Sequence, residues 1–215
     1  MIMMECWYFD VTALAEPGRF AYGLERLPWE ERKEKVLRFR PEEARRLSLG
    51  AGLLAAFCLR RAGAADLSLG TGEHGKPYLL HEPEIHFNLS HSGKLAVCAV
   101  GNEPMGVDVE EPQVMKEGVA RLSFTIQEKD WLAAQPDQDH AFVRLWTRKE
   151  SLLKFFGKGF YQSPLSADIC PDIPRQDEIC FFETEAQDHQ LCVCTKASAV
   201  KFSRCSAEEL LQFTV

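Results

Sequence analysis

The sequence predicts an α+β protein built from two similar halves, and three observations lead to this fold class. The chain has 215 residues, which is long for one hydrophobic core and short for two independent domains. Its hydrophobic content of 46%, with 14 Phe and 4 Trp, excludes disordered, collagen-like and coiled-coil chains. Strand-like and helix-like stretches occur twice in a similar order, and the second series begins near residues 101–104. We therefore expect an N-terminal half over residues 1–103 and a C-terminal half over residues 104–215.

The first half is expected to begin with one strand and two helices. Trp7 to Leu14 is typical of a strand. Pro28 to Phe39 has the composition of a helix, because a proline stands near its start and glutamates occupy the first turn, where the helix dipole favours acids. A second helix is expected from Pro41 to Arg61, and Gly63 is expected to end it.

Two apolar stretches then predict a β-hairpin. After the loop Gly70 to Pro77 come Ile85 to Leu89 and Leu95 to Val100, and the polar residues Ser90 to Lys94 separate them. Because serine and glycine favour turns, we expect these polar residues to form the tip of the hairpin.

The second half is expected to open with a strand that carries two acids. Met105 to Glu110 alternates apolar and acidic residues, so Val107 and Val109 point to one face while Asp108 and Glu110 point to the other. Three helices are expected to follow, at 117–122, 128–134 and 140–156, the last ended by Gly157. Strands are expected at 168–170, 179–183, 191–195 and 199–202.

Charge and apolar runs exclude several classes of protein. A formal charge of −7, from 25 basic and 32 acidic residues, argues against a dedicated nucleic-acid binder. The longest apolar run, Leu47 to Leu59, is shorter than the roughly 20 residues that a membrane span needs. Glu5 and Asp10 stand where a secretion signal would be apolar. We expect a cytoplasmic protein that binds neither nucleic acid nor membrane.

The eight cysteines are expected to be reduced side chains of the core. Most of them stand inside apolar stretches, as Cys58 and Cys98 do. The close pair Cys192 and Cys194 has no second pair at a zinc-finger spacing, so we interpret it as two side chains on one face of a strand.

A basic cluster departs from the acidic average. Between Arg32 and Arg46 lie seven basic residues and three acids. Such a cluster is either the solvated face of a helix or a binding site for a small anionic ligand, and its composition leaves both open.

Three short polar segments are the candidates for chemistry. The acidic face of the strand 105–110 is, alone, an ordinary exposed face. In a helical segment farther along, Glu150 and Lys154 lie one turn apart and, alone, form a surface ion pair. The third segment is Phe87 to Gly93, in which a structural turn explains Ser92 and Gly93 well and His91 less well.

Taken together, the three segments suit phosphate chemistry. Three carboxylates would hold Mg²⁺, which prefers oxygen ligands. Basic side chains would contact phosphates. The candidate metal ligands are Asp108, Glu110 and Glu150, and the candidate phosphate contacts are Arg32, Lys35, His91 and Lys154.

The chain resembles the 4′-phosphopantetheinyl transferases in three signatures that occur in the family's order. They are Phe87-Asn88-Leu89-Ser90-His91-Ser92, Met105-Gly106-Val107-Asp108-Val109-Glu110 and Trp146-x-x-Lys149-Glu150-Ser151-x-x-Lys154, with Gly75-Lys76-Pro77 ahead and Gly157-Lys158-Gly159 behind. The resemblance spans about residues 32–160. Length and two-half organisation resemble the large, Sfp-type members, which activate peptide and polyketide synthetases and are built as a pseudo-dimer.

The resemblance implies an enzyme that transfers 4′-phosphopantetheine from coenzyme A to a serine hydroxyl of an apo carrier protein and releases 3′,5′-ADP. Coenzyme A would lie between the halves, with Mg²⁺ on Asp108, Glu110 and Glu150. Ser90, His91 and Lys154 would contact phosphates. Arg32 and Lys35 would lie near the 3′-phosphate, and Lys76 would lie on the adenine side.

The resemblance also implies roles in the reaction. Glu150, directly or through a water on the metal, would act as the base, while Lys154 would neutralise charge on the phosphoryl oxygens. The partner would be an acidic acyl or peptidyl carrier protein, and a pseudo-dimer would work as a monomer. Glu128 matches a further acidic position of the family only loosely, so we leave it out of the ligand set.

Two other functions share parts of this pattern. A catalytically silent module that binds coenzyme A or a carrier protein would not require the complete set of carboxylates. A Mg²⁺-dependent phosphohydrolase would share the metal, but the sequence shows no feature that selects water.

Overall fold

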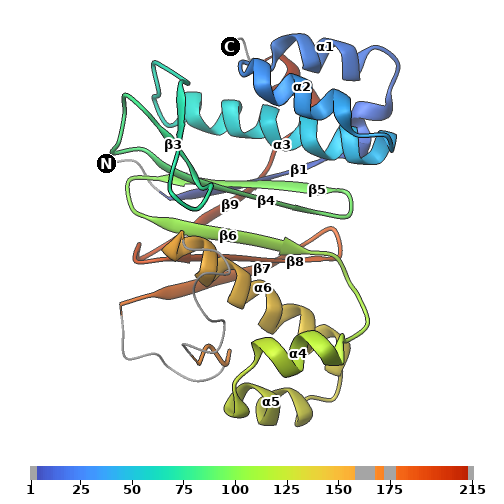
Figure 1. Ribbon diagram of the computed structural model, residues 1–215, viewed down its shortest axis with the longest axis vertical. Helices are drawn as coiled ribbons and strands as arrows, with labels where there is room; N and C mark the ends of the chain where they lie inside the picture. Colours follow the sequence, from blue (N-terminus) through green and yellow to red (C-terminus); the bar gives the residue numbers. More distant parts are fainter. Residues whose placement is uncertain (1–3, 158–167, 172–177, 213–215) are drawn as a thin grey trace.

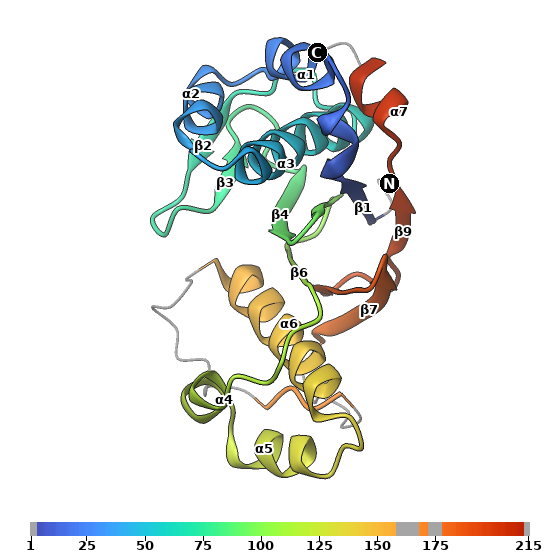
Figure 2. The ribbon, with the colours of Figure 1, turned by 90° about the vertical axis from the view of Figure 1, so that its right-hand side faces the viewer.

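The computed structural model describes residues 4–157, 168–171 and 178–212. They form an α+β fold of four layers, with two sheets in the middle and helices on both outer faces (Figures 1 and 2). The first sheet has the strand order β4-β5-β1-β9 and the second has the order β6-β8-β7, and a small hairpin pairs β2 with β3. The predicted α+β class is confirmed.

The first sheet combines strands from both ends of the chain. β1 (Glu5–Asp10) pairs antiparallel with β5 (Leu95–Gly101), which pairs antiparallel with β4 (His86–Ser92). On its other edge β1 pairs parallel with β9 (Lys201–Arg204). The chain then ends its described part in α7 (Ala207–Gln212), which packs beside α1. The last elements therefore lie in space with the first half.

Three helices cover the outer face of this sheet: α1 (Arg19–Arg26), α2 (Glu30–Arg38) and α3 (Glu42–Arg61). α3 lies across the sheet and is buried from Ser48 to Leu59. The predicted ends of α2 and α3 are confirmed within about two residues, which is the usual precision of helix boundaries. Gly63 follows α3 with a φ of 98°, a value that glycine adopts easily.

The second sheet is antiparallel throughout. β6 (Met105–Glu110) pairs with β8 (His189–Thr195), and β8 pairs with β7 (Cys180–Ala186). α6 (Gln138–Phe156) crosses the outer face of this sheet, and α4 (Glu117–Ser123) and α5 (Ile126–Ala133) pack at its far end (Figure 2). As predicted, α6 ends at Gly157, whose φ is 67°.

The alternation of side chains along the strands explains the layers. In β5, Leu95, Val97 and Ala99 face a core between the two sheets, which also contains Val107 and Val109 of β6. The intervening residues Ala96, Cys98 and Val100 face the core beneath α3. β5 is therefore apolar on both faces because both faces are covered.

Three predicted features need correction in the first half, and one helix was missed. The strand expected over 7–14 ends at Asp10, because the Asp10 carboxylate accepts from Thr12 N and caps the short helix η1 (Val11–Ala15). Helix α1 follows and was not predicted. The loop at 70–77 begins and ends in the paired strands β2 (Leu69–Thr71) and β3 (Pro77–Leu79). The hairpin tip is only Gly93 and Lys94, because Ser90, His91 and Ser92 continue β4 in register with β5.

Two corrections concern the second half. Residues 168–170 are not a strand, because Ile169 N donates to the carboxylate of Glu128 instead of to a neighbouring strand. Helix α7 was also not predicted. The other predicted strands correspond to β7, β8 and β9, each shifted by a few residues.

The expectation for the cysteines is confirmed. All eight are free thiols, and every one except Cys180 is buried. Among the helices of the described residues, none is both long and apolar enough to cross a bilayer.

Candidate active site

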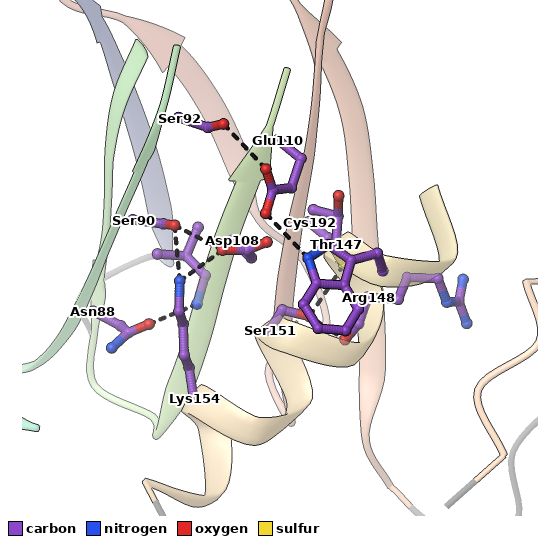
Figure 3. A network of polar contacts seen from close by, with 12 residues as sticks. Asn88, Ser90, Ser92, Asp108, Glu110, Thr147, Arg148, Ser151, Lys154 and Cys192 are labelled. Atoms are coloured by element: carbon purple, nitrogen blue, oxygen red, sulfur yellow. Dashed lines mark hydrogen bonds and ion pairs between the residues drawn. The ribbon is translucent and has the colours of Figure 1, made fainter. Parts of the chain in front are cut away.

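The site lies where β4, β6 and α6 meet. Side chains of β4 join it to β6: Asn88 Oδ1 accepts from Val107 N at 2.8 Å (Figure 3), and Ser92 Oγ accepts from Glu111 N at 3.2 Å. On the other side of β6, Gly106 lets the helix approach, because a Cβ at this position would lie 2.0 Å from Ser151 O. The acids of the strand and the polar face of the helix are therefore brought together.

A cavity of 610 Å³ opens at this junction between α2, α3, β4, β6 and α6. It brings together every residue predicted for the site except Lys76. The lining includes the carboxylates of Asp108, Glu110 and Glu150 and the polar or basic groups of Arg32, Lys35, Ser90, His91 and Lys154. Segments up to 122 positions apart in the sequence, from Arg32 to Lys154, thus share one cavity.

Lys154 holds the strand acid Asp108. Its Nζ lies 2.6 Å from Asp108 Oδ1 and donates to Ser90 Oγ at 2.8 Å, and Ser90 Oγ donates to Asp108 Oδ1 at 2.7 Å (Figure 3). The surface ion pair that the helical spacing suggests for Glu150 and Lys154 is therefore replaced by a pair with Asp108. A buried carboxylate gains more from a nearby cation than an exposed one does.

Glu110 is held by two donors that the sequence analysis did not assign. Trp146 Nε1 donates to Glu110 Oε1, and Ser92 Oγ donates to Glu110 Oε2, both at 3.1 Å. Burial and the negative charge of Asp108 raise the pKa of Glu110 despite these bonds. The sequence could have indicated the bond from Ser92, because Ser90 and Ser92 are two residues apart on one strand and Asp108 and Glu110 are two residues apart on another, so the two pairs can match.

Glu150 is the most perturbed carboxylate of the cavity. Its pKa is raised to about 7, mainly by burial and also by the negative charges of Asp108 and Glu110, while the positive charge of Lys154 opposes the rise. Glu150 Oε1 and Asp108 Oδ2 are both buried, and neither accepts a hydrogen bond from any residue that the structure describes. A buried oxygen without a hydrogen bond lowers the stability of the protein unless a ligand supplies the missing partner.

The carboxylates fit a hard cation such as Mg²⁺ in their chemistry, because all are oxygen ligands and two of them, Asp108 and Glu150, each have a buried oxygen without a partner among the described residues. Within the described ranges, however, no three His, Cys, Asp or Glu side chains already converge on one point. Lys154 neutralises Asp108 in this arrangement. Closing Asp108, Glu110 and Glu150 around an ion requires the side chains to turn toward one another.

The basic residues give the same cavity a positive region. Arg32 donates through Nη2 to Ser48 O at 3.1 Å, and its buried Nε has no partner in the part of the chain described. Partial burial lowers the pKa of His91, and the positive charges of Lys154, Arg32 and Lys35 lower it further. These cations are close enough to act on one imidazole, which favours an anionic ligand here.

Two further residues lie elsewhere. Lys76 Nζ donates to Met105 O and to Lys154 O, both at 2.8 Å, while its neighbour Pro77 lines the cavity. Glu128 is fully buried against Lys149 and does not line the cavity, which supports leaving it out of the ligand set. Residues 158 and 159 of the last motif lie outside the described residues.

Comparison with known proteins agrees with this site. Residues 104–205 match the family model of the 4′-phosphopantetheinyl transferase superfamily. A 4′-phosphopantetheinyl transferase of Bacillus subtilis is 36% identical over 179 residues, which cover 76% of this chain and 80% of that protein. The 4′-phosphopantetheinyl transferase Sfp of Bacillus subtilis strain 168 is 32% identical over 180 residues, with the same coverage. The 4′-phosphopantetheinyl transferase gsp of Aneurinibacillus migulanus is 43% identical over 91 residues, which cover 41% of this chain and 38% of that protein. The chain therefore belongs to the 4′-phosphopantetheinyl transferase family of enzymes.

Proposed function

We propose that this enzyme transfers the 4′-phosphopantetheine group of coenzyme A to a serine hydroxyl of an apo carrier protein, with Mg²⁺ as cofactor and 3′,5′-ADP as the second product. One observation carries the proposal: a single cavity combines three carboxylates with four basic groups. The carboxylates suit a metal and the basic groups suit phosphates. Coenzyme A has both a pyrophosphate, which Mg²⁺ binds, and a separate 3′-phosphate.

The lining suggests how the substrate binds. The volume of 610 Å³ lies in the range of ligand sites, about 300–1,000 Å³. We assign the 3′-phosphate to Arg32 and Lys35, and the pyrophosphate to Ser90, His91 and Lys154. The unpartnered Nε of Arg32 supports this assignment, because a phosphate oxygen would complete it.

Asp108, Glu110 and Glu150 would hold Mg²⁺. When bound, the ion would neutralise negative charge that develops on the phosphoryl oxygens. Trp146 and Ser92 orient Glu110 for this task, and Ser90 orients Asp108. Such orienting partners tune the affinity of metal sites.

In the transfer step the carrier serine oxygen attacks the β-phosphorus of coenzyme A. A new phosphodiester bond forms, the bond from this phosphorus to the bridging oxygen breaks, and 3′,5′-ADP leaves with the electron pair. Glu150, directly or through a water on the metal, would accept the proton of the serine hydroxyl. Lys154 keeps a positive charge beside the reacting phosphate.

We also propose that residues 1–103 and 104–215 are the two halves of a pseudo-dimer that acts as a monomer on an acidic carrier protein. Each half places one long helix, α3 or α6, across one sheet, which supports this relation. The site then lies between the halves and needs no second chain.

The test is incubation of the protein with coenzyme A, MgCl₂ and an apo carrier protein. Intact-mass analysis should show a carrier heavier by one phosphopantetheine group, together with free 3′,5′-ADP, and EDTA should prevent both. A silent binding module would bind coenzyme A and leave the carrier unchanged. A phosphohydrolase would cleave coenzyme A without any carrier.

A further inference from the structure

We infer that Lys76 is a positioning residue that holds Lys154 against Asp108 by tying the loop between β2 and β3 to β6 and α6. The inference rests on the proposed function of the cavity. It differs from the role on the adenine side that the family resemblance implies for Lys76.

The contacts of Lys76 join three walls of the cavity. Its Nζ donates to Met105 O, at the start of β6, and to Lys154 O, in the last turn of α6, both at 2.8 Å. These acceptors lie 29 and 78 residues away along the chain. Met105 begins the strand that carries Asp108, and Lys154 itself binds Asp108 at 2.6 Å. One ammonium group therefore fixes the backbone on both sides of the ion pair.

The end of α6 is a favourable place for this cation. The last carbonyls of a helix lack intrahelical partners, and the helix dipole makes this end negative. A lysine of the helix's own last turn often meets this need. Here Lys154 of that turn points to Asp108 and Ser90, and a lysine from the other half of the molecule takes its place.

The packing around Lys76 supports a dedicated role. Gly157 adopts a φ of 67°, and a Cβ at this position would lie 3.3 Å from Lys76 Cδ. The glycine thus ends the helix and also leaves room for the lysine stem. Burial lowers the pKa of Lys76 to about 8, so the ammonium is removed from water at a cost.

The geometry favours positioning over contact with the substrate. Lys76 does not line the 610 Å³ cavity, although its neighbour Pro77 does. Both acceptors of its ammonium group are backbone carbonyls, those of Met105 and Lys154, and Met105 does not line that cavity either. Removing the ammonium should therefore loosen Lys154 and Pro77 and leave the other phosphate contacts, Arg32, Lys35, Ser90 and His91, in place.

The main test compares Lys76→Met, which keeps the stem and removes the donors, with Lys76→Arg, which restores donors. Arg60→Met is a matched control, because Arg60 also donates to two backbone carbonyls, those of Ala64 and Ala65, at the end of α3. The measurements are kcat, the Kd of coenzyme A, and the rate at which acetic anhydride labels Lys154 in the free protein.

We expect Lys76→Met to lower kcat about tenfold, to change the Kd of coenzyme A by less than about twofold, and to speed labelling of Lys154 about threefold or more. Lys76→Arg should restore kcat and the labelling rate, and Arg60→Met should leave both at wild-type values. A Kd raised about tenfold with kcat unchanged would show that Lys76 binds the substrate and would overturn the inference. Unchanged kcat and labelling in Lys76→Met would overturn it as well.

A measurement on the wild-type protein decides the matter even where Lys76→Met does not fold. Lys76 should be labelled slowly with or without coenzyme A, whereas coenzyme A should protect Lys35. Rapid labelling of Lys76 that coenzyme A suppresses would contradict positioning. If wild-type protein transferred nothing to a carrier, the proposed function would fail, while the labelling of Lys76 and Lys154 would still test the position of Lys154.

Discussion

Lys149 and Glu150 are neighbours on α6, yet they belong to two polar networks of opposite character. Lys149 points into the C-terminal half, where its side chain is 1% exposed and its Nζ lies 2.7 Å from the carboxylate of Glu128, which is 0% exposed. That carboxylate also accepts from Ile169 N and Thr125 N. Glu150 points into the cavity, where its buried Oε1 accepts no hydrogen bond from any described residue.

The difference separates what the fold needs from what a ligand must supply. A buried polar group without a hydrogen bond costs about 1–3 kcal/mol, so a network that serves only stability tends to complete its bonds, as the Glu128 network does. A polar network in a cavity can lack hydrogen bonds where a bound ligand supplies the missing partners. Successive helix residues point about 100° apart, so one short motif supplies both networks.

The largest effect is expected from a substitution in the cavity network. Glu150→Gln should lower kcat between about 100-fold and 10,000-fold, because the amide can neither accept the serine proton nor balance a metal charge. The variant should remain folded, since removing one of several like charges relieves repulsion with Asp108 and Glu110. Turnover with coenzyme A and carrier, and the thermal midpoint, measure the two effects. Near-normal turnover with Mg²⁺ present would remove Glu150 from the metal site and from the role of base.

The matched change in the other network should have the opposite outcome. Glu128→Gln leaves the Lys149 ammonium buried without its carboxylate, and removing one partner of a buried pair costs about 3–5 kcal/mol. Urea denaturation measures the loss in the free energy of unfolding. The double variant with Lys149→Met should regain most of the loss, and kcat at low temperature should stay near wild type. A loss below about 1 kcal/mol would show that the two networks differ less than their geometry indicates.

Local patterns predicted which side chains share the cavity better than which side chains contact one another. Strand alternation placed Asp108 and Glu110 on one face, and helical spacing placed Glu150 and Lys154 together. The partner of Lys154 was missed because Asp108 lies 46 residues away and only the approach of α6 to Gly106 makes the contact. The carbonyl contacts of Lys76 likewise exist only in the folded protein.

The elements that sequence analysis missed have particular physical causes. Helix α1 contains Gly23, which lowers helix propensity, and follows Pro17 and Gly18, which are typical of turns. The segment at 168–170 has the apolar character of a strand, but the Glu128 carboxylate takes its backbone donor. β9 joins the first sheet through a pairing nearly 200 residues away from β1, which no local pattern indicates.

A smaller effect concerns the pH dependence of Mg²⁺ binding, which tests Glu150 as a metal ligand. Its pKa of about 7 in the metal-free protein means that it holds a proton below pH 7, which Mg²⁺ must displace. Mg²⁺ should therefore bind about tenfold more weakly at pH 6 than at pH 8. Calorimetric titration with MgCl₂ at both values measures this, and Glu150→Gln should show a much smaller change. Equal affinities for the wild-type protein at the two pH values would contradict a ligand role for this carboxylate.

The cations of the molecule differ in whether they pair with an acid. Arg144 and Arg148 of α6 share the carboxylate of Glu183 in β7, at distances of 2.8–3.0 Å. Lys35, in contrast, forms no ion pair with any acid of the described residues, and it lines the cavity near Arg32. An exposed lysine without a partner can serve a ligand without first breaking a bond.

Lys35→Ala should therefore weaken coenzyme A about tenfold, the loss of one charge-assisted hydrogen bond. Binding of 3′-dephospho-coenzyme A should change by less than about twofold, because the acceptor of that bond is missing from this ligand. Calorimetric titration of both ligands into wild type and variant gives the two ratios. The control is Lys33→Ala, because Lys33 lies two residues before Lys35 on α2, pairs with Glu30 and does not line the cavity. Equal losses for both ligands would place the 3′-phosphate away from Lys35. The basic cluster from Arg32 to Arg46 would then be the solvated face of α2 and α3. Arg32 would be the one residue of the cluster that still contacts a ligand in the cavity.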